Sequence, residues 1–460
     1  MSRPILDYGS MMSPRLPRAG SGVEPDRLAG ALSAGFRGAH ATVQARRATG
    51  EIGFFDLPDD RAAAGRVTEV AASLGAGLRD VVVLGIGGSG LGATTLRDVL
   101  CGLRWNQDEA ARAGRPRLHV LDNPDPETVT GLLGALDPST TLFNVISKSG
   151  STAETMSLYL VARAWVTDAL GEATIPERFV FTTDPKTGVL RRIADREGIT
   201  TLDVPPNVGG RFSVLTAVGL LPAALMGCDI DALLQGALEM REACSGDDLA
   251  SNPAGLFASL LHDADTRQGR AIHVLMPYAD RLRSLTLWFQ QLWAESLGKV
   301  RDGQHVGPTP LPAVGATDQH AQVQLFMEGP HDKVVVFLAT PVAGDPVMIP
   351  ALHPDENALS YLGGSSLGEL LDLERQATAE ALRQGGRPSM TLELAAVDAR
   401  TLGALIMFFE VATVFAGALY GVDPLNQPGV ELGKTLTYGL MGREGFPVPE
   451  IDSSGGEWRS

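Results

Sequence analysis

Short apolar runs alternate with longer stretches of helical periodicity, and this alternation restricts the possible folds more than any other feature of the chain. The runs are rich in β-branched and aromatic residues, as expected for strands buried on both faces of a parallel sheet. Turn residues or glycines follow each run, and a helical pattern such as AETMSLYLVARAW comes next. This order predicts an α/β fold with a parallel sheet. The predicted strands are 81–84, 118–121, 142–146 and 179–181.

A second round of the same alternation begins near residue 230. It contains a long helix at about 281–297 and strands at 271–276, 334–338 and 390–394. The 460 residues are too many for one ordinary core, so the chain is expected to form two α/β domains with shorter appendages. The expected division is an N-terminal arm at 1–60 with one short helix, a first domain at 61–228, a second at 229–424, and a C-terminal helix and tail at 425–460.

Residues 401–420 form the most apolar stretch, TLGALIMFFEVATVFAGALY. Its length would suffice to cross a membrane. Glu410 stands at its centre and no other segment resembles it, so a helix buried between the two domains is the favoured interpretation.

Charge and cysteine content limit the partners. The net charge of −16 gives no general attraction to nucleic acid or to anionic lipid, so neither is expected as a partner. Three cysteines without a CxxC pair argue against a disulfide scaffold. The first twenty residues lack the apolar run of a signal peptide, and a cytoplasmic location is expected.

Two glycine- or serine-rich motifs each follow a predicted strand and open a predicted helix. The first, GIGGSGLG at 85–92, lets a ligand approach backbone amides closely. A nicotinamide site is less favoured, because Asp122 lies well beyond the position that such a site needs. A purely structural tight turn is a further alternative.

The second motif, SKSGSTAET at 147–155, supplies four hydroxyls, a lysine and backbone N–H groups at a helix start. These groups suit a phosphate monoester. The alternative is an ordinary helix cap, which needs only one hydroxyl. The chain has no GxxxxGK[ST] motif, so a nucleoside triphosphate is not expected.

An arginine and a glutamate are the candidates for the chemistry itself. Arg211, in GGRFS, can present a fixed fork of donors to a developing oxyanion, although a surface arginine in a turn is equally compatible with the pattern. Glu295, in QLWAESLGK, shares a helix face with Gln291 among apolar neighbours that favour a general base. Its alternative is a solvated glutamate that pairs with Lys299.

Two further motifs carry one titratable side chain each. His320 in DQHAQVQ is expected to share a helix face with Gln324, and it has no neighbouring His or Cys at metal-ligand spacing. A structural histidine is its alternative. In NQPGVELGK, Pro428 is expected to start a helix that carries Gln427 and Lys434 on one side. The alternative is an amphipathic C-terminal helix with an exposed lysine.

In this order, the six motifs resemble those of the glucose-6-phosphate isomerase family of the short bacterial type, over residues 50 to 440. The resemblance implies two sugar-isomerase (SIS) domains, each an α/β/α sandwich, and a reversible aldose–ketose isomerisation through a cis-enediolate. It implies no metal and no cofactor. It also implies a homodimer in which the motif histidine completes the neighbouring subunit's site.

The resemblance further implies a role for each motif residue. Glu295 would be the base, and Arg211 would stabilise the enediolate. His320 and Lys434 would open the sugar ring, with Glu154 orienting the histidine. The remaining family positions would bind phosphate or sugar: Ser147, Lys148, Ser149 and Thr152 for the phosphate, and Gly88, Ser89, Gln291 and Gln427 for sugar or phosphate.

Three alternatives remain open from the sequence. A dual phosphoglucose/phosphomannose isomerase would share the same motifs. A phosphosugar-binding regulatory module would keep the glycines and the hydroxyl-rich loop but would not need Glu295, His320 and Lys434 together. A nicotinamide dehydrogenase is the third.

Overall fold

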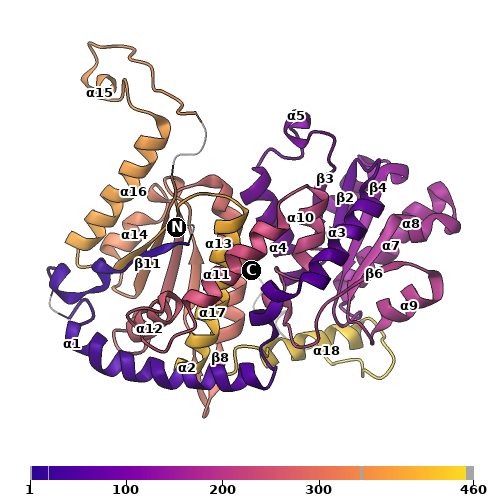
Figure 1. Cartoon of the computed structure of the whole chain (residues 1–460), viewed down its shortest axis with the longest axis horizontal. Helices are drawn as coiled ribbons and strands as arrows, with labels where there is room; N and C mark the ends of the chain where they lie inside the picture. Colours follow the sequence, from indigo (N-terminus) through magenta and orange to yellow (C-terminus); the bar gives the residue numbers. More distant parts are fainter. Residues whose placement is uncertain (1–2, 19, 342–344, 452–460) are drawn as a thin grey trace.

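The computed structural model describes residues 3–18, 20–341 and 345–451. Two five-stranded sheets lie on opposite sides of the molecule, with α4, α10, α11, α13 and α17 between them (Figure 1). The first sheet has the order β3-β2-β4-β5-β6 and is parallel throughout. Its strands are β2 (Asp80–Leu84), β3 (Arg117–Leu121), β4 (Thr141–Ile146), β5 (Phe179–Thr183) and β6 (Thr200–Asp203).

The second sheet has the order β1-β12-β11-β7-β10. It is parallel except for the edge strand β1, which pairs antiparallel with β12. The α/β fold with parallel sheets flanked by helices, predicted from the alternating pattern, is therefore confirmed. The strands are β1 (Ile5–Asp7), β7 (Ile272–Pro277), β10 (Thr309–Pro312), β11 (Lys333–Ala339) and β12 (Ser389–Glu393), and a separate hairpin consists of β8 (Lys299–Arg301) and β9 (Gln304–Val306).

The remaining elements include the α-helices, several of which cover the faces of the two sheets (Figure 1). In the first half of the chain they are α1 (Pro25–Arg27), α2 (Ser33–Ala48), α3 (Arg61–Gly75), α4 (Gly88–Leu96), α5 (Glu109–Arg112), α6 (Pro126–Gly134), α7 (Ala153–Leu170), α8 (Ile175–Arg178), α9 (Val189–Glu197) and α10 (Ala217–Leu225). In the second half they are α11 (Ile230–Ala243), α12 (Pro253–Thr266), α13 (Arg283–Leu297), α14 (Val323–Glu328), α15 (Asn357–Ser360), α16 (Leu367–Gln384), α17 (Ala399–Tyr420) and α18 (Glu431–Leu440).

Strand β2 shows why its sequence is apolar throughout. Val81 and Val83 belong to the hydrophobic cluster that fills the centre of the molecule, whereas Val82 and Leu84 belong to a separate cluster under α7. Successive side chains of a strand point to opposite faces, so both faces of this strand are buried.

The most apolar helix, α17, runs through the centre of the molecule. By length and composition it could cross a membrane, but 89% of its most apolar window is buried inside the protein. It packs against α11, α12, α13 and α2. The predicted buried helix is therefore confirmed.

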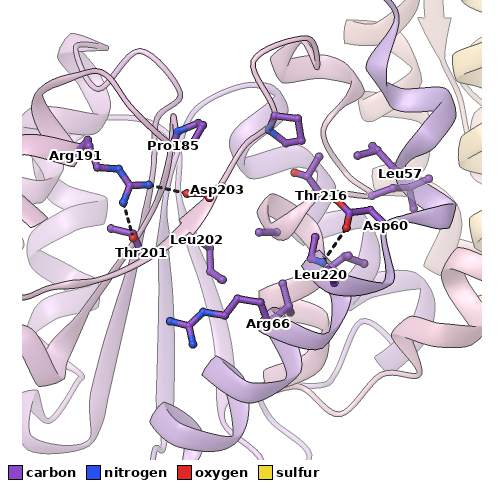
Figure 2. Close-up of a pocket in the computed structure, with 16 residues that line it drawn as sticks. Leu57, Asp60, Arg66, Pro185, Arg191, Thr201, Leu202, Asp203, Thr216 and Leu220 are labelled. Carbon is purple, nitrogen blue, oxygen red and sulfur yellow. Dashed lines mark hydrogen bonds and ion pairs between the residues drawn. The ribbon is translucent and has the colours of Figure 1, made fainter. Parts of the chain in front are cut away.

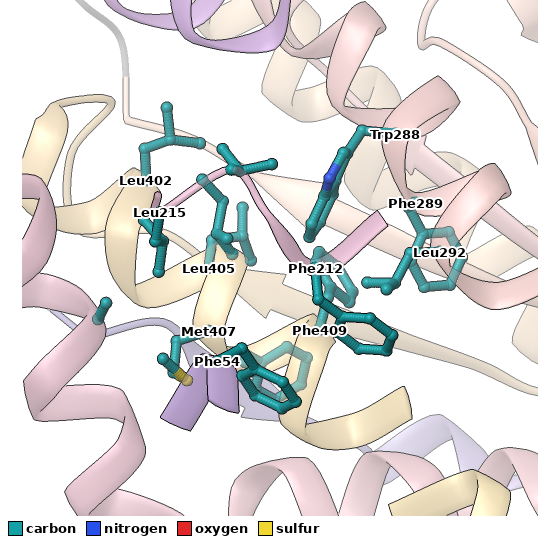
Figure 3. Packing of buried hydrophobic residues seen from close by; sticks show 14 of the residues in the cluster. Phe54, Phe212, Leu215, Trp288, Phe289, Leu292, Leu402, Leu405, Met407 and Phe409 are labelled. Atoms are coloured by element: carbon teal, nitrogen blue, oxygen red, sulfur yellow. The ribbon is translucent and has the colours of Figure 1, made fainter. Parts of the chain in front are cut away.

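The central cluster holds the segments that carry the chemical motifs. Phe212 stacks on Phe54 with ring centroids 5.1 Å apart, and Phe289 lies 4.8 Å from Phe409 of α17 (Figure 3). Phe212 follows Arg211, and Phe289 lies on the helix of Glu295. The loop of the arginine and the helix of the glutamate are thus packed into one core.

Several sequence-based expectations about individual elements are wrong. The N-terminal segment contains the 16-residue helix α2 instead of one short helix. The short strands β1, β6 and β10 and the hairpin β8–β9 were not expected. The tail after residue 451 lies outside the described residues.

A segment between β11 and α16 projects beyond the rest of the molecule, with α15 near its tip (Figure 1). It begins at residue 345 among the described residues and rejoins the body at Leu367. Several of its large apolar side chains are more than 45% exposed, namely Val347, Met348, Leu352, Leu359 and Tyr361.

Candidate active site

Arg211 and Glu295 form an ion pair at the junction of the two halves of the chain. Arg211 lies in a 3-10 turn (Gly210–Phe212), and Glu295 lies in the last turn of α13. Arg211 Nη1 is 3.3 Å from Glu295 Oε1. The arginine side chain is 3% exposed and that of the glutamate 27%, so the carboxylate faces solvent while the guanidinium lies beneath it.

The remaining donors of Arg211 fix the guanidinium in one orientation. Its Nε donates to Ser296 Oγ at 2.7 Å and its Nη1 to Gln427 Oε1 at 3.2 Å. Its Nη2 donates to the carbonyls of Pro424 and Asn426. Burial lowers the pKa of Arg211, but a guanidinium stays protonated at any ordinary pH. A fixed positive charge therefore lies directly beside the Glu295 carboxylate.

Gln291 orients the other oxygen of the carboxylate. Its Nε2 donates to Glu295 Oε2 at 3.0 Å, which confirms that the two side chains share a helix face. Gln291 Oε1 is buried and has no partner among the described residues. One unpaired buried acceptor beside the carboxylate is suited to a hydroxyl donor from a ligand.

The glycine-rich loop approaches these groups closely. Gly87 has a φ of +58°, and a Cβ there would lie 2.7 Å from Gln291 Nε2. A Cβ at Gly88 would lie 2.2 Å from the carbonyl oxygen of Gly210. Glycine is thus required at both positions so that the start of α4, with Gly88 and Ser89, can contact the Arg211 loop and Gln291.

Lys299 does not pair with the carboxylate of Glu295. Its Nζ donates to the main-chain carbonyls of Glu295 and Ser296, at 2.5 and 3.1 Å, and so caps the end of α13. Burial lowers the pKa of Lys299 to about 8. The alternative of a solvated glutamate paired with Lys299 is therefore wrong.

The hydroxyl-rich loop lies beside the glycine-rich loop, because β2 and β4 are adjacent parallel strands whose carboxyl ends meet. Ser147 Oγ accepts from the backbone N–H of Gly150 at 3.1 Å and lies 3.2 Å from Thr152 Oγ1. Ser149 Oγ accepts from the backbone N–H and the hydroxyl of Ser151. Thr152 is the N-cap of α7, but its hydroxyl does not cap the helix. The cap alternative therefore does not account for these hydroxyls.

Lys148 connects this loop to the segment that leads to Arg211. Its Nζ donates to the carbonyls of Pro206 and Val208, at 2.6 and 2.9 Å. Burial lowers the pKa of Lys148. The lysine thus holds the two loops together.

The residues expected to open the sugar ring are not assembled within one chain. His320 follows the 3-10 turn Thr317–Gln319 and is exposed, and Lys434 is exposed on α18, where it pairs with Glu431 at 2.9 Å. Glu154 lies in the first turn of α7. Within the described chain, no hydrogen bond or ion pair joins His320 to Glu154 or to Glu295.

Two expected helix faces are wrong. His320 precedes α14, so it does not share a helix with Gln324. Gln427 is the N-cap of a 3-10 turn that Pro428 opens, and α18 begins only at Glu431, so Gln427 and Lys434 lie on different elements. Gln427 reaches Arg211, whereas Lys434 does not.

A cavity of about 670 Å³ opens over Glu295. Lys299, Asn426 and Gln427 line it, together with two residues that sequence reasoning missed, His305 of β9 and Asp423. Neither belongs to one of the six motifs, so no pattern in the sequence pointed to them.

A second cavity, of about 550 Å³, lies between α3, α10 and the end of β6 (Figure 2). Arg191 in its wall is bound to Asp203 at 2.6 Å and to Thr201 at 2.7 Å. None of its described lining residues is a glutamate or a histidine, and none belongs to the Arg211–Glu295 site. The candidate acid–base residues therefore do not line this second cavity.

Across residues 3–18, 20–341 and 345–451 there is no group of three or more His, Cys, Asp or Glu side chains that could hold a metal ion.

Comparison with known proteins agrees with this architecture. The profile of the family described as phosphoglucose isomerase matches residues 63–445. A glucose-6-phosphate isomerase from Rubrobacter xylanophilus is 48% identical over 395 residues, which are 86% of this chain and 90% of that protein. One from Carboxydothermus hydrogenoformans is 43% identical over 418 residues, 89% of each chain.

Solved structures agree as well. A hypothetical protein from Thermus thermophilus superposes with a TM-score of 0.84 at 39% identity, covering 95% of this chain and 99% of that one. A glucose-6-phosphate isomerase from Chlamydia trachomatis has the same fold, with a TM-score of 0.70 at 24% identity over 83% of this chain and 73% of that one. The two-sheet fold expected from the resemblance is confirmed, and it is that of a sugar-phosphate isomerase. The chain belongs to the phosphoglucose isomerase family.

Proposed function

We propose that the protein interconverts glucose 6-phosphate and fructose 6-phosphate, in glycolysis and gluconeogenesis, by proton transfer through a cis-enediolate. The observation that carries this proposal is the Glu295 carboxylate held between Arg211 and Gln291 at the edge of a cavity. Isomerisation next to a carbonyl needs one base and one group that stabilises the oxyanion, and these residues provide both.

Each residue of the site has a role in this reaction. Glu295 takes the proton from C2 and returns it to C1. The guanidinium of Arg211, which lies beneath the carboxylate, stabilises the negative charge of the enediolate. Because its donors are already fixed by Ser296, Pro424 and Asn426, little reorganisation is needed when the charge develops.

The phosphate binds between the starts of α4 and α7. Hydroxyls of Ser147, Ser149 and Thr152 surround it, the backbone N–H groups at the helix start face it, and Lys148 adds positive charge. Gly88, Ser89, Gln291 and Gln427 contact the sugar. Binding the unreactive phosphate at one end orients the reacting carbons over Glu295 at the other.

Ring opening requires an acid and a base that this chain does not bring to its own site. We propose that His320 of a partner subunit supplies one of them, oriented by Glu154, and that Lys434 supplies the other. Lys434 lies one helical turn from Tyr438, whose hydroxyl donates to the carbonyl of Ser151 at 3.3 Å. Helix α18 therefore lies next to the phosphate loop, within reach of a bound sugar.

A homodimer accounts for two features that a single chain leaves unused. His320 is exposed and is not bonded to Glu295 within the described chain. The projecting segment at 345–366 carries exposed apolar side chains (Figure 1). Exposed apolar side chains on such a projecting segment are suited to packing against another subunit. A two-fold axis would then create two equivalent composite sites.

We also propose the division of the chain into an arm at 1–60, domains at 61–228 and 229–424, and a C-terminal part at 425–460. All strands of the first sheet fall within 61–228, and all strands of the second except β1 fall within 229–424.

Three free thiols support a reducing, cytoplasmic location.

The experiment that tests the proposed function is a coupled assay in both directions with fructose 6-phosphate and glucose 6-phosphate. We expect turnover of both without added metal or nicotinamide in the isomerase step. Binding of either sugar without turnover would instead indicate a regulatory module. Turnover of mannose 6-phosphate at a similar rate would indicate a dual isomerase, although the relatives described above are named glucose-6-phosphate isomerases.

A further inference from the structure

Two cysteines from distant parts of the chain lie in contact at a place that the isomerase site does not use. Cys101 ends the π-helical turn that continues α4, and Cys228 lies between α10 and α11. Their Sγ atoms are 3.5 Å apart across a sequence separation of 127 residues. This separation is about 1.5 Å longer than a disulfide bond of about 2.05 Å, so the sulfurs must approach each other for a bond to form.

The pair is accessible from solvent, whereas the third cysteine is not. Cys101 and Cys228 are partly exposed and both line a cavity of about 420 Å³. Cys244 is buried, with its Sγ 3.7 Å from Met240 Sδ. An oxidant from solvent can thus reach the pair, and Cys244 provides a matched internal control.

Charged groups around the pair favour a reactive thiolate. The Arg115 guanidinium donates to the carbonyls of Met226 and Gly227, beside Cys228, and so is held in place. The hydrogen bond from Cys228, together with the positive charge of Arg115, outweighs burial and lowers the pKa of Cys101. The hydrogen bond to Cys101 and burial raise the pKa of Cys228. Cys101 is thus the more nucleophilic thiol, and Cys228 is the thiol that stays protonated.

The acidic groups at this cavity are engaged elsewhere. Asp229 caps α11 by accepting from the backbone N–H of Ala232, and Asp398 caps α17 by accepting from that of Thr401. Arg97 and Arg281 add further positive charge near Cys101. Three arginines, of which Arg97 is paired with Asp98, thus act together to lower the pKa of Cys101.

We propose that Cys101 and Cys228 form a reversible intramolecular disulfide under peroxide stress. The Cys101 thiolate attacks one oxygen of hydrogen peroxide, the O–O bond breaks, and Cys101 becomes a sulfenic acid while the other oxygen leaves as water after protonation. Cys228 then attacks the sulfenic sulfur, its proton passes to the departing hydroxyl as the S–O bond breaks, and a second water leaves. Two thiols and one peroxide thus give one disulfide and two waters, and a dithiol reverses the reaction.

The bond would connect the two segments that carry the glycine-rich loop and Arg211. Helix α4 begins at Gly88, and α10 follows the Arg211 turn. A crosslink over so many residues restricts the unfolded chain, so oxidation is expected to raise the melting temperature.

The test treats the reduced full-length protein with hydrogen peroxide and then blocks free thiols with N-ethylmaleimide under denaturing conditions. We expect the loss of two alkylation sites, a mass lower by two hydrogens before labelling, and a peptide that links Cys101 to Cys228. Dithiothreitol should restore both sites, and the oxidised protein should melt several degrees higher than the reduced protein.

Three variants test the role of each cysteine separately. Cys244→Ser should form the disulfide as the parent does. Cys228→Ser should leave Cys101 as a sulfenic acid that dimedone labels, and Cys101→Ser should leave Cys228 unoxidised. The proposal is overturned if both cysteines of the parent remain open to alkylation after peroxide treatment, or if peptide mapping finds a different pairing.

Discussion

The Arg211 guanidinium lies 3.3 Å from the Glu295 carboxylate and is itself held by Ser296, the next residue of the same helix. The proposed base and the proposed stabiliser of the enediolate are therefore positioned by one turn of α13. A change at Glu295 is expected to affect catalysis more than folding.

Replacing Glu295 with Gln should reduce kcat by about 10²- to 10⁴-fold, because the change removes the base and preserves the shape. The KM for fructose 6-phosphate and the melting temperature should change little. A matched control is Glu242→Gln, at an exposed position of α11. A loss of kcat below tenfold in Glu295→Gln, with Glu242→Gln normal, would show that Glu295 is not the base.

Replacing Arg211 with Lys should lower kcat/KM by about 10²- to 10³-fold, as expected when a preorganised donor to an oxyanion is lost. A lysine keeps the charge but cannot reach Ser296, Gln427 and the two carbonyls at once. The measurement is steady-state kinetics together with the melting temperature. If the variant keeps the parent's kcat/KM, the guanidinium has no special role in the reaction.

Replacing both Ser147 and Thr152 with Ala should weaken the thermal protection given by inorganic phosphate. Ligand stabilisation follows site occupancy, so the phosphate-dependent rise in melting temperature should shrink. Ser157→Ala is the control, because that hydroxyl lies at an exposed position of α7 and donates to the carbonyl of Glu154. An unchanged phosphate response in the double variant would place the phosphate elsewhere.

Glu410 should make stability depend on pH. It is fully buried in α17, and neither carboxylate oxygen has a partner among the described residues. Burial raises the pKa of Glu410 well above the usual range of a glutamate. The folded protein therefore binds a proton that the unfolded chain releases, so this residue lowers stability as pH rises above the unfolded pKa.

Glu410→Gln removes this dependence while keeping the shape of the side chain. Its melting temperature should exceed that of the parent by a margin that grows as the pH rises above the unfolded pKa of a glutamate, about 4.3, toward the raised pKa of the folded state, because over that range each pH unit adds about 1.4 kcal/mol for one group. Glu242→Gln again serves as the control and should show no such trend. A constant difference at all pH values would mean that Glu410 is ionised inside the protein.

The composite site can be tested by mixing two inactive variants, Glu295→Gln and His320→Ala. If the histidine crosses the dimer interface, each heterodimer has one site with both lesions and one site with neither, so activity returns on subunit exchange. If heterodimers form and activity does not return, each subunit uses its own histidine.

The strands and the buried helix could be predicted from the sequence because their signals are local. The run VVVL at 81–84 is apolar throughout since both faces of β2 are covered. Helix α17 is apolar on nearly all sides, apart from Glu410, because most of it is buried inside the protein. Strand β10 was not predicted because its sequence TPLP contains two prolines, which argue against a strand. The prolines are tolerated because β10 lies at the edge of the sheet.

The site was only partly predictable, since contacts between distant segments leave no local signal. The shared face of Gln291 and Glu295 followed from helical spacing. The hydrogen bonds from Lys299 to main-chain carbonyls depend instead on where α13 ends. His320 and Gln324 lie on different elements because the chain breaks before α14, and that break depends on tertiary packing. The positions of His305 and Asp423 in the cavity wall depend on the β8–β9 hairpin and the end of α17.

The most direct test of the proposed mechanism is to follow the reaction in D₂O by NMR over many turnovers. If Glu295 carries the proton between C2 and C1, the proton bound to its carboxyl group exchanges with solvent during part of the turnovers. Deuterium should then accumulate at C1 of fructose 6-phosphate and at C2 of glucose 6-phosphate. Full conversion without deuterium at either carbon would indicate a direct hydride shift and would contradict the assignment of Glu295 as the base.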